Sequence, residues 1–286
     1  MPGTLFVVAT PIGNLGDLSP RAVEVLKNAA LIACEDTRTS RTLLMRFGIA
    51  TRSMALHEHN ERAAASTLID ALRSNGDVAL ISDAGTPTVS DPGARLVDEA
   101  HRAGIRVVPV PGPNAAIAAF SASGFPAERF LFAGFLPSSA GARRKAIAAL
   151  ERGSNRDCAV ILYEAPHRIR ATLADLAAGC GAKREVAIGR ELTKKFEEMV
   201  RMPLGDAPGW LDERPHREQG EYVLVLAPGS GSSESIPGAL DADHVLATLL
   251  EALGPSDAAK LAARLTGHAR RALYARALEL AGRSKR

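Results

Sequence analysis

The chain has 286 residues, of which 46% are hydrophobic and 23% are charged, and its formal net charge is +3. This is an ordinary globular composition and a length sufficient for two domains, and no apolar run approaches the roughly 20 residues of a membrane span. The first residues, MPGTLFVVAT, lack the basic segment of a signal peptide, and Cys34, Cys158 and Cys180 are too few and too widely spaced for a disulfide framework. We therefore expect a reduced, cytoplasmic protein that makes no use of a membrane.

Short apolar runs rich in β-branched residues predict seven strands. They lie at 5–9, 30–34, 78–82, 106–110, 158–163, 185–190 and 221–227, with a weaker eighth candidate at 53–57. Helical patterns alternate with them: one begins at the N-cap Ser19 followed by Pro20, and the next runs from Asn60 to Gly76. Strands that alternate with helices predict an α/β fold with a largely parallel sheet.

Composition divides the chain into four parts. We predict an N-terminal α/β domain at 1–124, a second α/β domain at 125–228, a Gly/Ser/Pro-rich linker at 229–239 and a helical domain at 240–286.

The predicted helical domain is basic. Its last two helices are separated by Gly267-His268, a spacing typical of a helix-turn-helix. Residues 260–286 contain eight Lys or Arg and one acidic residue, so this segment carries +7 and the rest of the chain −4. A basic tail on a mildly acidic body indicates contact with a polyanion, although a solvated helix surface is the plain alternative.

The stretch ISDAGTPTVSDPG, residues 81–93, follows an apolar strand and is rich in Gly, Pro, Asp and hydroxyl residues. It contains no lysine that could meet a phosphate, and the chain has neither a GxxxxGK[ST] nor a GxGxxG motif. Metal binding is also disfavoured, because Asp83 and Asp91 have no EF-hand spacing and His57 and His59 have no clear third ligand. We expect Asp91 to be the N-cap of the next helix, with Pro92 at its start.

Three further loops with Gly or Pro follow predicted strands, namely ATPIGNLGD at 9–17, VPGPNAAIAAF at 110–120 and YEAPHR at 163–168. In an open parallel sheet, loops at the carboxyl ends of strands converge on one crevice. The four loops together predict a pocket lined by backbone groups with few charges, suited to an uncharged or cationic ligand such as a nucleoside.

A dense cluster of charges occupies GRELTKKFEEMV, residues 189–200. We expect Arg190, Glu191 and Lys194 at a strand end, followed by Glu197 and Glu198 on a helix. The cluster fits either a salt-bridged helix start or a site with phosphate contacts and a proton acceptor.

The segments TPIGNLGDLSPRAVEVL, CEDTR, SDAGTPTVSDPG, VPGPNAA, YEAPHR and RELTK occur here in this order. Together they resemble the ribosomal RNA small subunit methyltransferase I family over almost the whole chain. The resemblance implies two α/β domains of the tetrapyrrole-methylase fold, with S-adenosylmethionine bound in the cleft between them and no metal. It also implies 2′-O-methylation of a cytidine in the decoding region of 16S ribosomal RNA, within the small subunit, by a cytoplasmic homodimer.

The resemblance also implies roles for particular residues. The expected donor contacts are Pro11, Asp83, Ala84, Gly85, Thr86, Pro87, Val89, Ser90, Pro113, Ala116, Tyr163, Leu192 and Ala227. The acceptor side follows instead from charges at predicted strand ends. There we expect Glu191, Lys194, Asp36 and Arg38, with Glu191 or a neutral Lys194 as the base. Arg38 and Arg190 are expected to hold flanking phosphates, and the basic tail and residues 143–145 to contact the RNA backbone.

Two other functions stay open at this point. A tetrapyrrole C-methyltransferase would share the fold, but the place of its GxGxGD loop is taken by TPIGNLGD and the basic tail would have no use. A non-catalytic RNA-binding protein with a vestigial cleft would not need to retain all four loops.

Overall fold

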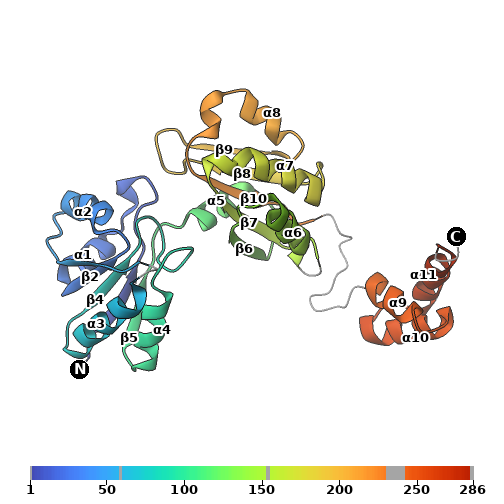
Figure 1. Ribbon diagram of the computed structural model, residues 1–286, viewed down its shortest axis with the longest axis horizontal. Helices are drawn as coiled ribbons and strands as arrows, with labels where there is room; N and C mark the ends of the chain where they lie inside the picture. Colours follow the sequence, from blue (N-terminus) through green and yellow to red (C-terminus); the bar gives the residue numbers. More distant parts are fainter. Residues whose placement is uncertain (1, 58–59, 153–154, 230–241, 284–286) are drawn as a thin grey trace.

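The computed structural model describes residues 2–57, 60–152, 155–229 and 242–283, with side chains described up to Leu280. Two five-stranded sheets, each in its own domain, follow one another along the chain, and three helices lie apart from both (Figure 1). In the described part of the chain, no helix is both long enough and apolar enough to cross a membrane. The predicted linker, 229–239, lies outside the described residues except for Gly229.

The first sheet is entirely parallel, with strand order β3-β2-β4-β1-β5. Its strands are β1 (Thr4–Val8), β2 (Leu31–Cys34), β3 (Ser53–Ala55), β4 (Val78–Ile81) and β5 (Arg106–Val110). Its helices are α1 (Pro20–Asn28), α2 (Thr37–Arg46), α3 (Glu61–Arg73) and α4 (Ala94–Arg102), with a 3-10 turn η1 (Leu15–Asp17). The sequence predictions for all five strands are confirmed to within one or two residues.

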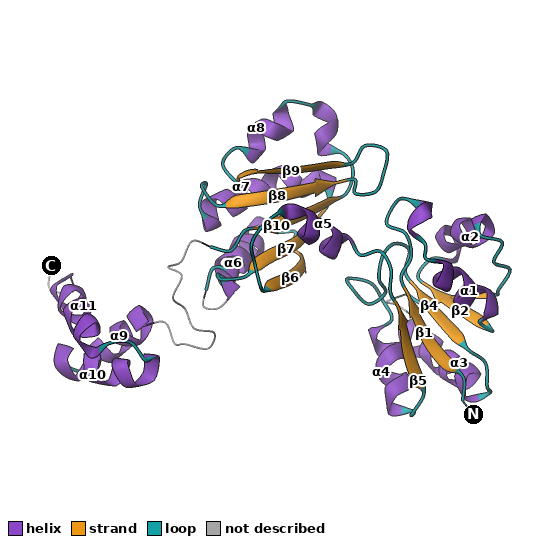
Figure 2. Cartoon of the chain, turned by 180° about the vertical axis from the view of Figure 1, so that it is seen from behind, coloured by secondary structure: helices purple, strands orange, loops and turns teal. Residues whose placement is uncertain are grey.

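The helices of the first domain cover both faces of its sheet (Figure 2). Leu26 of α1 and Leu44 of α2 belong to one buried cluster, and Leu68 of α3 and Leu96 of α4 to another. The connection leaving β1 and the connection leaving β4 therefore pass to opposite faces, although the two strands are neighbours in the sheet. Such a switch point is where open α/β sheets bind ligands.

Helix α1 begins as its sequence predicts. The Ser19 hydroxyl accepts a hydrogen bond from Ala22 N at 3.1 Å, and Pro20 stands at the first helical position. Helix α4 begins differently from its prediction. Its N-cap is Gly93, with no side-chain cap, so the prediction that Asp91 caps this helix is wrong. The chain turns through two further residues after Asp91 before the helix starts, which leaves this carboxylate free to face elsewhere.

The second sheet has strand order β6-β7-β10-β8-β9, and only its β6–β7 pair is parallel. Its strands are β6 (Phe130–Phe135), β7 (Ala159–Glu164), β8 (Glu185–Arg190), β9 (Glu198–Pro203) and β10 (Tyr222–Leu226). The expectation of a largely parallel sheet is thus wrong for this half, because β9 pairs antiparallel with β8 and β10 lies between β7 and β8, antiparallel to both.

Helices cover both faces of the second sheet. One face carries α6 (Ala140–Leu150), α7 (Ile169–Cys180) and α8 (Ala207–Asp212), with 3-10 turns η3 (Pro166–Arg168) and η4 (Pro215–Glu218). The other is covered by α5 (Ala115–Ser123), whose Ala116 and Ala119 pack on Val223 and Val225. Since α5 follows β5 of the first sheet, it links the two domains.

Two strands escaped the sequence analysis. Glu198 begins the edge strand β9, so the helix predicted at Glu197 and Glu198 is wrong. Strand β6 has a register shift between Phe132 and Gly134, where Gly134 takes a positive φ of 61°, so its pairing with β7 is irregular.

The C-terminal helices form a separate bundle with its own core. They are α9 (Ala242–Leu250), α10 (Pro255–Thr266) and α11 (Arg270–Arg283), and α10 and α11 are joined through Gly267 in the left-handed region at φ 75°. Leu246, Ala258, Ala262, Leu273 and Ala277 are buried between them. The helix-turn-helix prediction is therefore confirmed in its geometry.

Candidate functional site

A cavity of about 350 Å³ lies between the two α/β domains. The first domain contributes the loops after β1, β4 and β5, and the second contributes the ends of β6, β7, β8 and β10. The lining residues are Ile12, Ala84, Gly85, Thr86, Val89, Ser90, Asp91, Asn114, Ala115, Phe135, Tyr163, Glu164, Ala165, Pro166, Leu192, Glu221, Tyr222 and Val223. All four of the Gly/Pro loops singled out in the sequence thus reach this cavity.

The loop after β4 is fixed against the loop after β1. Gly85 and Thr10 exchange two backbone hydrogen bonds, of 2.8 and 3.1 Å, and the Thr86 hydroxyl donates to Pro113 O at 3.0 Å. Gly85, Thr88 and Ser90 all have positive φ angles, of 81°, 70° and 65°. A left-handed backbone costs a non-glycine residue about 1–2 kcal/mol, and such strain gathers at functional sites.

Tyr163 forms part of the wall contributed by the second domain. Its hydroxyl accepts a hydrogen bond from Ala116 N at 3.3 Å, which ties the end of β7 to the start of α5. Burial raises the pKa of Tyr163. Its ring makes edge contacts with Phe132, at 5.0 Å between centroids, and with Phe135, at 5.7 Å. Phe135 lines the cavity and is nevertheless 54% exposed, so it stands at the rim.

An acidic group lies on the first-domain side of the cavity. Burial and the nearby charge of Asp83 raise the pKa of Glu35. Burial and the charge of Glu35 raise the pKa of Asp91 to about 6. Asp36 differs from both, because a hydrogen bond from Arg38 lowers its pKa to about 2. Only Asp91 of this group lines the cavity.

Asp36 and Arg38 form a surface pair. The two side chains approach to 2.7 Å, and Asp36 also accepts from Arg38 N at 2.7 Å, as the N-cap of α2. Asp36 N donates to Asp83 Oδ1 at 3.2 Å, which links this pair to the loop after β4. Arg38 remains 89% exposed, so its guanidinium is open to a partner from solution.

The loop between β8 and β9 contains a network around Lys194. Lys194 Nζ donates to Glu191 Oε1 at 2.9 Å and to Glu221 Oε2 at 2.8 Å. Burial alone would lower the pKa of Lys194, but these two carboxylates outweigh it and raise that pKa. Lys194 is therefore a cation at neutral pH, and the hypothesis of a neutral Lys194 base is wrong. Burial alone would raise the pKa of Glu191. The hydrogen bonds that Glu191 accepts from Lys194 and from Glu221 N outweigh this effect, so the pKa of Glu191 is lowered.

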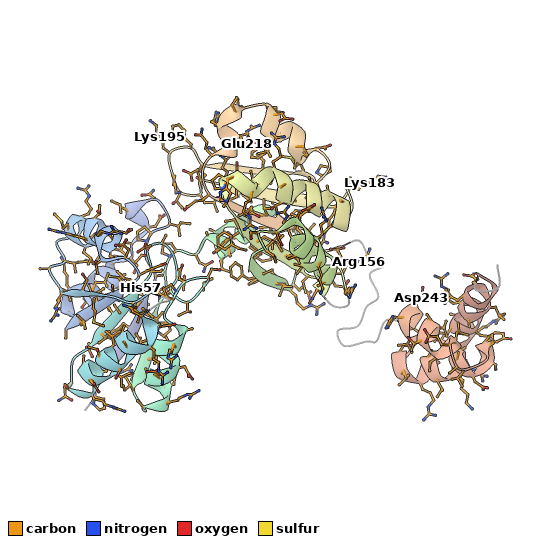
Figure 3. All side chains as sticks on the ribbon, in the orientation of Figure 1. His57, Arg156, Lys183, Lys195, Glu218 and Asp243 are labelled. Carbon is orange, nitrogen blue, oxygen red and sulfur yellow. The ribbon has the colours of Figure 1, made fainter. Side chains whose placement is uncertain are left out.

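This loop extends toward the first domain, and the labelled Lys195 marks its position in Figure 3. The Thr193 hydroxyl accepts a hydrogen bond from Asn14 N at 3.1 Å, so the loop touches the TPIGNLGD segment. Arg190, in contrast, is almost fully buried, and its guanidinium donates to Gln219 O and His216 O at 2.8 Å each. The expected contact between Arg190 and a phosphate is thus wrong, because its donors are already used within the fold.

The predicted residues divide into two sets. Those that line the cavity are Ala84, Gly85, Thr86, Val89, Ser90, Tyr163 and Leu192. Those that do not are Pro11, Asp83, Pro87, Pro113, Ala116 and Ala227 among the expected donor contacts, and Asp36, Arg38, Glu191 and Lys194 on the acceptor side. Pro113 and Ala116 are joined to the wall by the bonds to Thr86 and Tyr163 described above.

Several lining residues were not predicted. Six of them belong to loops that the sequence analysis assigned to the pocket, although it did not name them as ligand contacts: Ile12, Asn114, Ala115, Glu164, Ala165 and Pro166. Phe135, Tyr222 and Val223 lie outside every quoted motif, and only the full pairing of the second sheet places them here.

No group of three or more metal-binding side chains is found within the described residues, and His59, one of the two histidines considered as ligands, lies outside them.

Comparison with known proteins follows the same division into domains. The family model of Tetrapyrrole (Corrin/Porphyrin) Methylases matches residues 4–208, and that of the RsmI C-terminal HTH domain matches residues 237–281. Ribosomal RNA small subunit methyltransferase I of Pseudomonas aeruginosa is 47% identical over 99% of both chains. The protein of that name from Escherichia coli O157:H7 is 45% identical, over 98% of this chain and 96% of its own.

Solved structures match the two α/β domains. Diphthine synthase superposes with a TM-score of 0.60 at 18% identity, over 79% of this chain and 90% of its own. The cobalt precorrin-4 methyltransferase CbiF superposes with a TM-score of 0.58 at 14% identity, over 78% of this chain and 94% of its own. At these identities the likeness establishes the fold alone.

Proposed function

The chain belongs to the ribosomal RNA small subunit methyltransferase I family, and we propose that it methylates the ribose 2′-hydroxyl of a cytidine in the decoding region of 16S ribosomal RNA. It is an S-adenosylmethionine-dependent methyltransferase built on the tetrapyrrole-methylase fold. The observation that carries the proposal is the interdomain cavity, whose chemistry suits this donor.

The cavity fits S-adenosylmethionine in size and charge. Its volume of about 350 Å³ is within the roughly 300–1,000 Å³ typical of small-molecule pockets. The lining contains no Lys, Arg or His but three carboxylates, those of Asp91, Glu164 and Glu221, which favours a cation and disfavours a phosphate. The donor, which has no phosphate, supplies a methyl group activated by a positively charged sulfur.

We assign the donor-holding role to residues from both domains. They are Pro11, Asp83, Ala84, Gly85, Thr86, Pro87, Val89, Ser90, Pro113, Ala116, Tyr163, Leu192 and Ala227. Their main support is that seven of them line the cavity and that Pro113 and Ala116 brace two of those seven. Rigid loops suit methyl transfer, because an activated donor needs mainly correct positioning.

An RNA acceptor has to approach from outside, since a cavity of this volume holds one donor-sized molecule. The exposed ring of Phe135 at the rim offers a face on which an unpaired base can stack. Enzymes that act on a nucleotide draw it out of its helix or use unpaired segments, and an aromatic rim serves that purpose. We therefore place the cytosine against Phe135 with its ribose turned into the cavity.

Two charged groups border this approach. Arg38, paired only with Asp36 in the described structure, is proposed to bind a flanking phosphate, with Asp36 fixing its orientation. Lys194 and Glu191, in the β8–β9 loop of the second domain, are also proposed to hold the acceptor strand, Lys194 as a cation and Glu191 as an ionised acceptor of hydrogen bonds. A Lys194→Ala variant with full methylation rate and full RNA affinity would remove Lys194 from this role.

The helical domain is proposed to bind the ribosomal RNA backbone. Its exposed cations include Lys260 and Arg264 in α10 and Arg270 and Arg271 at the start of α11. Arg276 instead pairs with Asp243 at 2.8 Å and with Glu279. Truncation after Pro237 should weaken RNA binding and flatten its salt dependence, because fewer phosphate contacts release fewer counterions.

Of residues 143–145, which were expected to contact RNA, only two have side chains that a phosphate can reach. Arg143 is buried and pairs with Asp175 at 2.7 Å, so it is not available to a phosphate. Arg144 and Lys145 are exposed and remain candidates. Action on the assembled small subunit, a cytoplasmic location and a homodimer also belong to the proposal, supported by the family resemblance; light scattering in solution tests the last.

Transfer of radiolabel tests the proposal as a whole. Labelled donor is offered to naked 16S RNA, to small subunits and to a tetrapyrrole precursor. Label in RNA or subunits supports the proposal. Label in the tetrapyrrole alone favours a C-methyltransferase on the same fold. No transfer, together with no donor binding in a titration, favours a non-catalytic RNA-binding protein.

A further inference from the structure

The loop between β8 and β9, residues 191–197, is held in one conformation by its own contacts. Glu191 and Thr193, neither of them a glycine, take positive φ angles of 51° and 66°. Thr193 N donates a hydrogen bond to Glu197 Oε1 at 2.8 Å. Lys194 N donates to Glu191 O at 3.0 Å. A left-handed backbone at two non-glycine residues is strain, and such strain gathers at functional sites.

The same loop is anchored to both domains. Within the second domain, the buried guanidinium of Arg190 donates to Phe196 O at 3.2 Å. From the first domain, Asn14 N donates to the Thr193 hydroxyl at 3.1 Å. Leu192, in the same loop, lines the donor cavity. The loop therefore has a fixed position at the border of the cavity.

This rigid loop presents an aromatic side chain to solvent. Phe196 is 63% exposed, which is more than Phe135 at the cavity rim. The Lys195 ammonium lies 5.4 Å from the centre of the Phe196 ring, and Lys195 forms no ion pair with any described residue. Figure 3 shows Lys195 on the side of the second domain that is nearer to the first. Single-stranded nucleic acid binds to such pairs, because an aromatic ring stacks on a base and a cation attracts a phosphate.

We propose that Phe196 stacks on the base of a nucleotide that flanks the methylated cytidine, while Lys195 binds the adjoining phosphate; this inference rests on the function proposed above. Phe135 receives the target base and Phe196 its neighbour. A nucleotide drawn out of its helix loses its stacking with the nucleotides beside it, and a ring that stacks on one of these offsets part of the cost. Because the loop is already ordered, little conformational entropy is lost on binding.

A second copy of this chain is the other partner that an exposed ring could take. In loop 191–197, which the structure describes in full, Phe196 is the single large hydrophobic side chain that is exposed. It stands between Lys195 and Glu197, whereas the cores of protein interfaces are depleted in Lys and Glu. These surroundings favour RNA.

The first test replaces Phe196 by leucine, which keeps apolar contact and removes the ring. We expect the KM for small subunits to rise roughly 5- to 30-fold, while the Kd for S-adenosylmethionine changes less than about twofold. Phe196→Trp should restore the KM, since an indole stacks as a phenyl ring does. Phe130→Leu is the matched control, because Phe130 is also exposed but lies on β6, outside this loop, and should leave the KM unchanged.

The second test measures the salt dependence of RNA binding. Lys195→Ala should reduce the slope of log K against log salt by about 0.7–0.9, because one phosphate contact is lost. Lys183→Ala is its control: Lys183 is exposed and precedes β8, at the opposite end of that strand from Lys195 (Figure 3). This variant should leave the slope unaltered.

The third test identifies the partner. In Phe196→Trp, the introduced indole should lose fluorescence when a short unpaired RNA oligonucleotide is added, as stacking on a base requires. Trp210 is buried, and the wild-type protein measures its contribution. A fluorescence change that follows protein concentration and not RNA would identify a second copy as the partner.

Three results would overturn the inference: an unchanged KM in Phe196→Leu, a loss of donor affinity that equals the rise in KM, or an indole that responds to protein concentration alone. In each case the wild-type protein still methylates RNA, so the proposed function stands. A wild-type protein that transfers no methyl group to RNA refutes the proposed function itself. If Phe196→Leu does not fold, as judged by its melting curve, an unaltered salt slope in Lys195→Ala refutes the inference alone.

Discussion

Replacement of Phe135 by leucine separates acceptor binding from donor binding. The Phe135 ring is 54% exposed at the cavity rim and makes an edge-type contact with the ring of Tyr163. Stacking of a base on an aromatic ring is worth about 1–3 kcal/mol by alanine substitution. Leucine retains apolar contact but no ring face, so we expect a loss of about 1–2 kcal/mol, which is roughly a 5- to 30-fold rise in KM for RNA.

The assay measures KM and kcat with small subunits at saturating donor, and donor Kd by titration. Phe130 supplies the control, since it lies on the same strand, is 44% exposed and does not line the cavity. Phe130→Leu should leave KM for RNA unchanged. If Phe135→Leu weakens donor binding and leaves the KM for RNA unchanged, the ring contacts the donor and not the RNA. That result would refute the stacking argument.

Three further predictions test other parts of the molecule. Arg264→Ala should weaken RNA binding and reduce the slope of log K against log salt by about 0.7–0.9, with no change in donor Kd; an unaltered slope would exclude Arg264 as a phosphate contact. Gly93→Ala should destabilise the first domain by about 2–4 kcal/mol in denaturant unfolding, because its φ is 118° and the new Cβ would lie 2.7 Å from Leu80 Cδ2. Gly104→Ala, with φ 67° and open space around the new Cβ, should cost only about 1–2 kcal/mol, and equal losses at both glycines would refute the steric argument. Asp91→Asn should raise the melting temperature at pH 8 but not at pH 4, because a carboxyl whose pKa is raised to about 6 by folding contributes stability at low pH and loses it as pH rises through 6; an equal change at both pH values would contradict the raised pKa.

The first domain was predictable from sequence because its signals are local. Each parallel strand is a short apolar run between turn residues, and Ser19-Pro20 marks a helix start as the physics of capping requires. The second sheet has fewer such signals. Its edge strand β9 mixes Met and Val with Glu198 and Arg201 without a clear alternation, and the run of charges before Glu198 resembles a helix surface.

The site was predictable at the level of loops but not of individual side chains. Gly, Pro and Asp at strand ends identified the segments that meet, because parallel strands bring their carboxyl ends to one edge. Asp91 was misread because Asp-Pro-Gly before a helical pattern is also a common N-terminal signal. Arg190 was misread because a sequence shows charge but not burial, and its partners Gln219 and His216 lie on a distant segment.

The identity of the methylated nucleoside tests the central claim most directly. Small subunits that lack the modification are incubated with the purified protein and S-adenosylmethionine, and the digested RNA is examined by mass spectrometry. The account predicts one new product, 2′-O-methylcytidine, in a fragment from the decoding region. A methyl group on a base, on another nucleoside or on no RNA at all would contradict it.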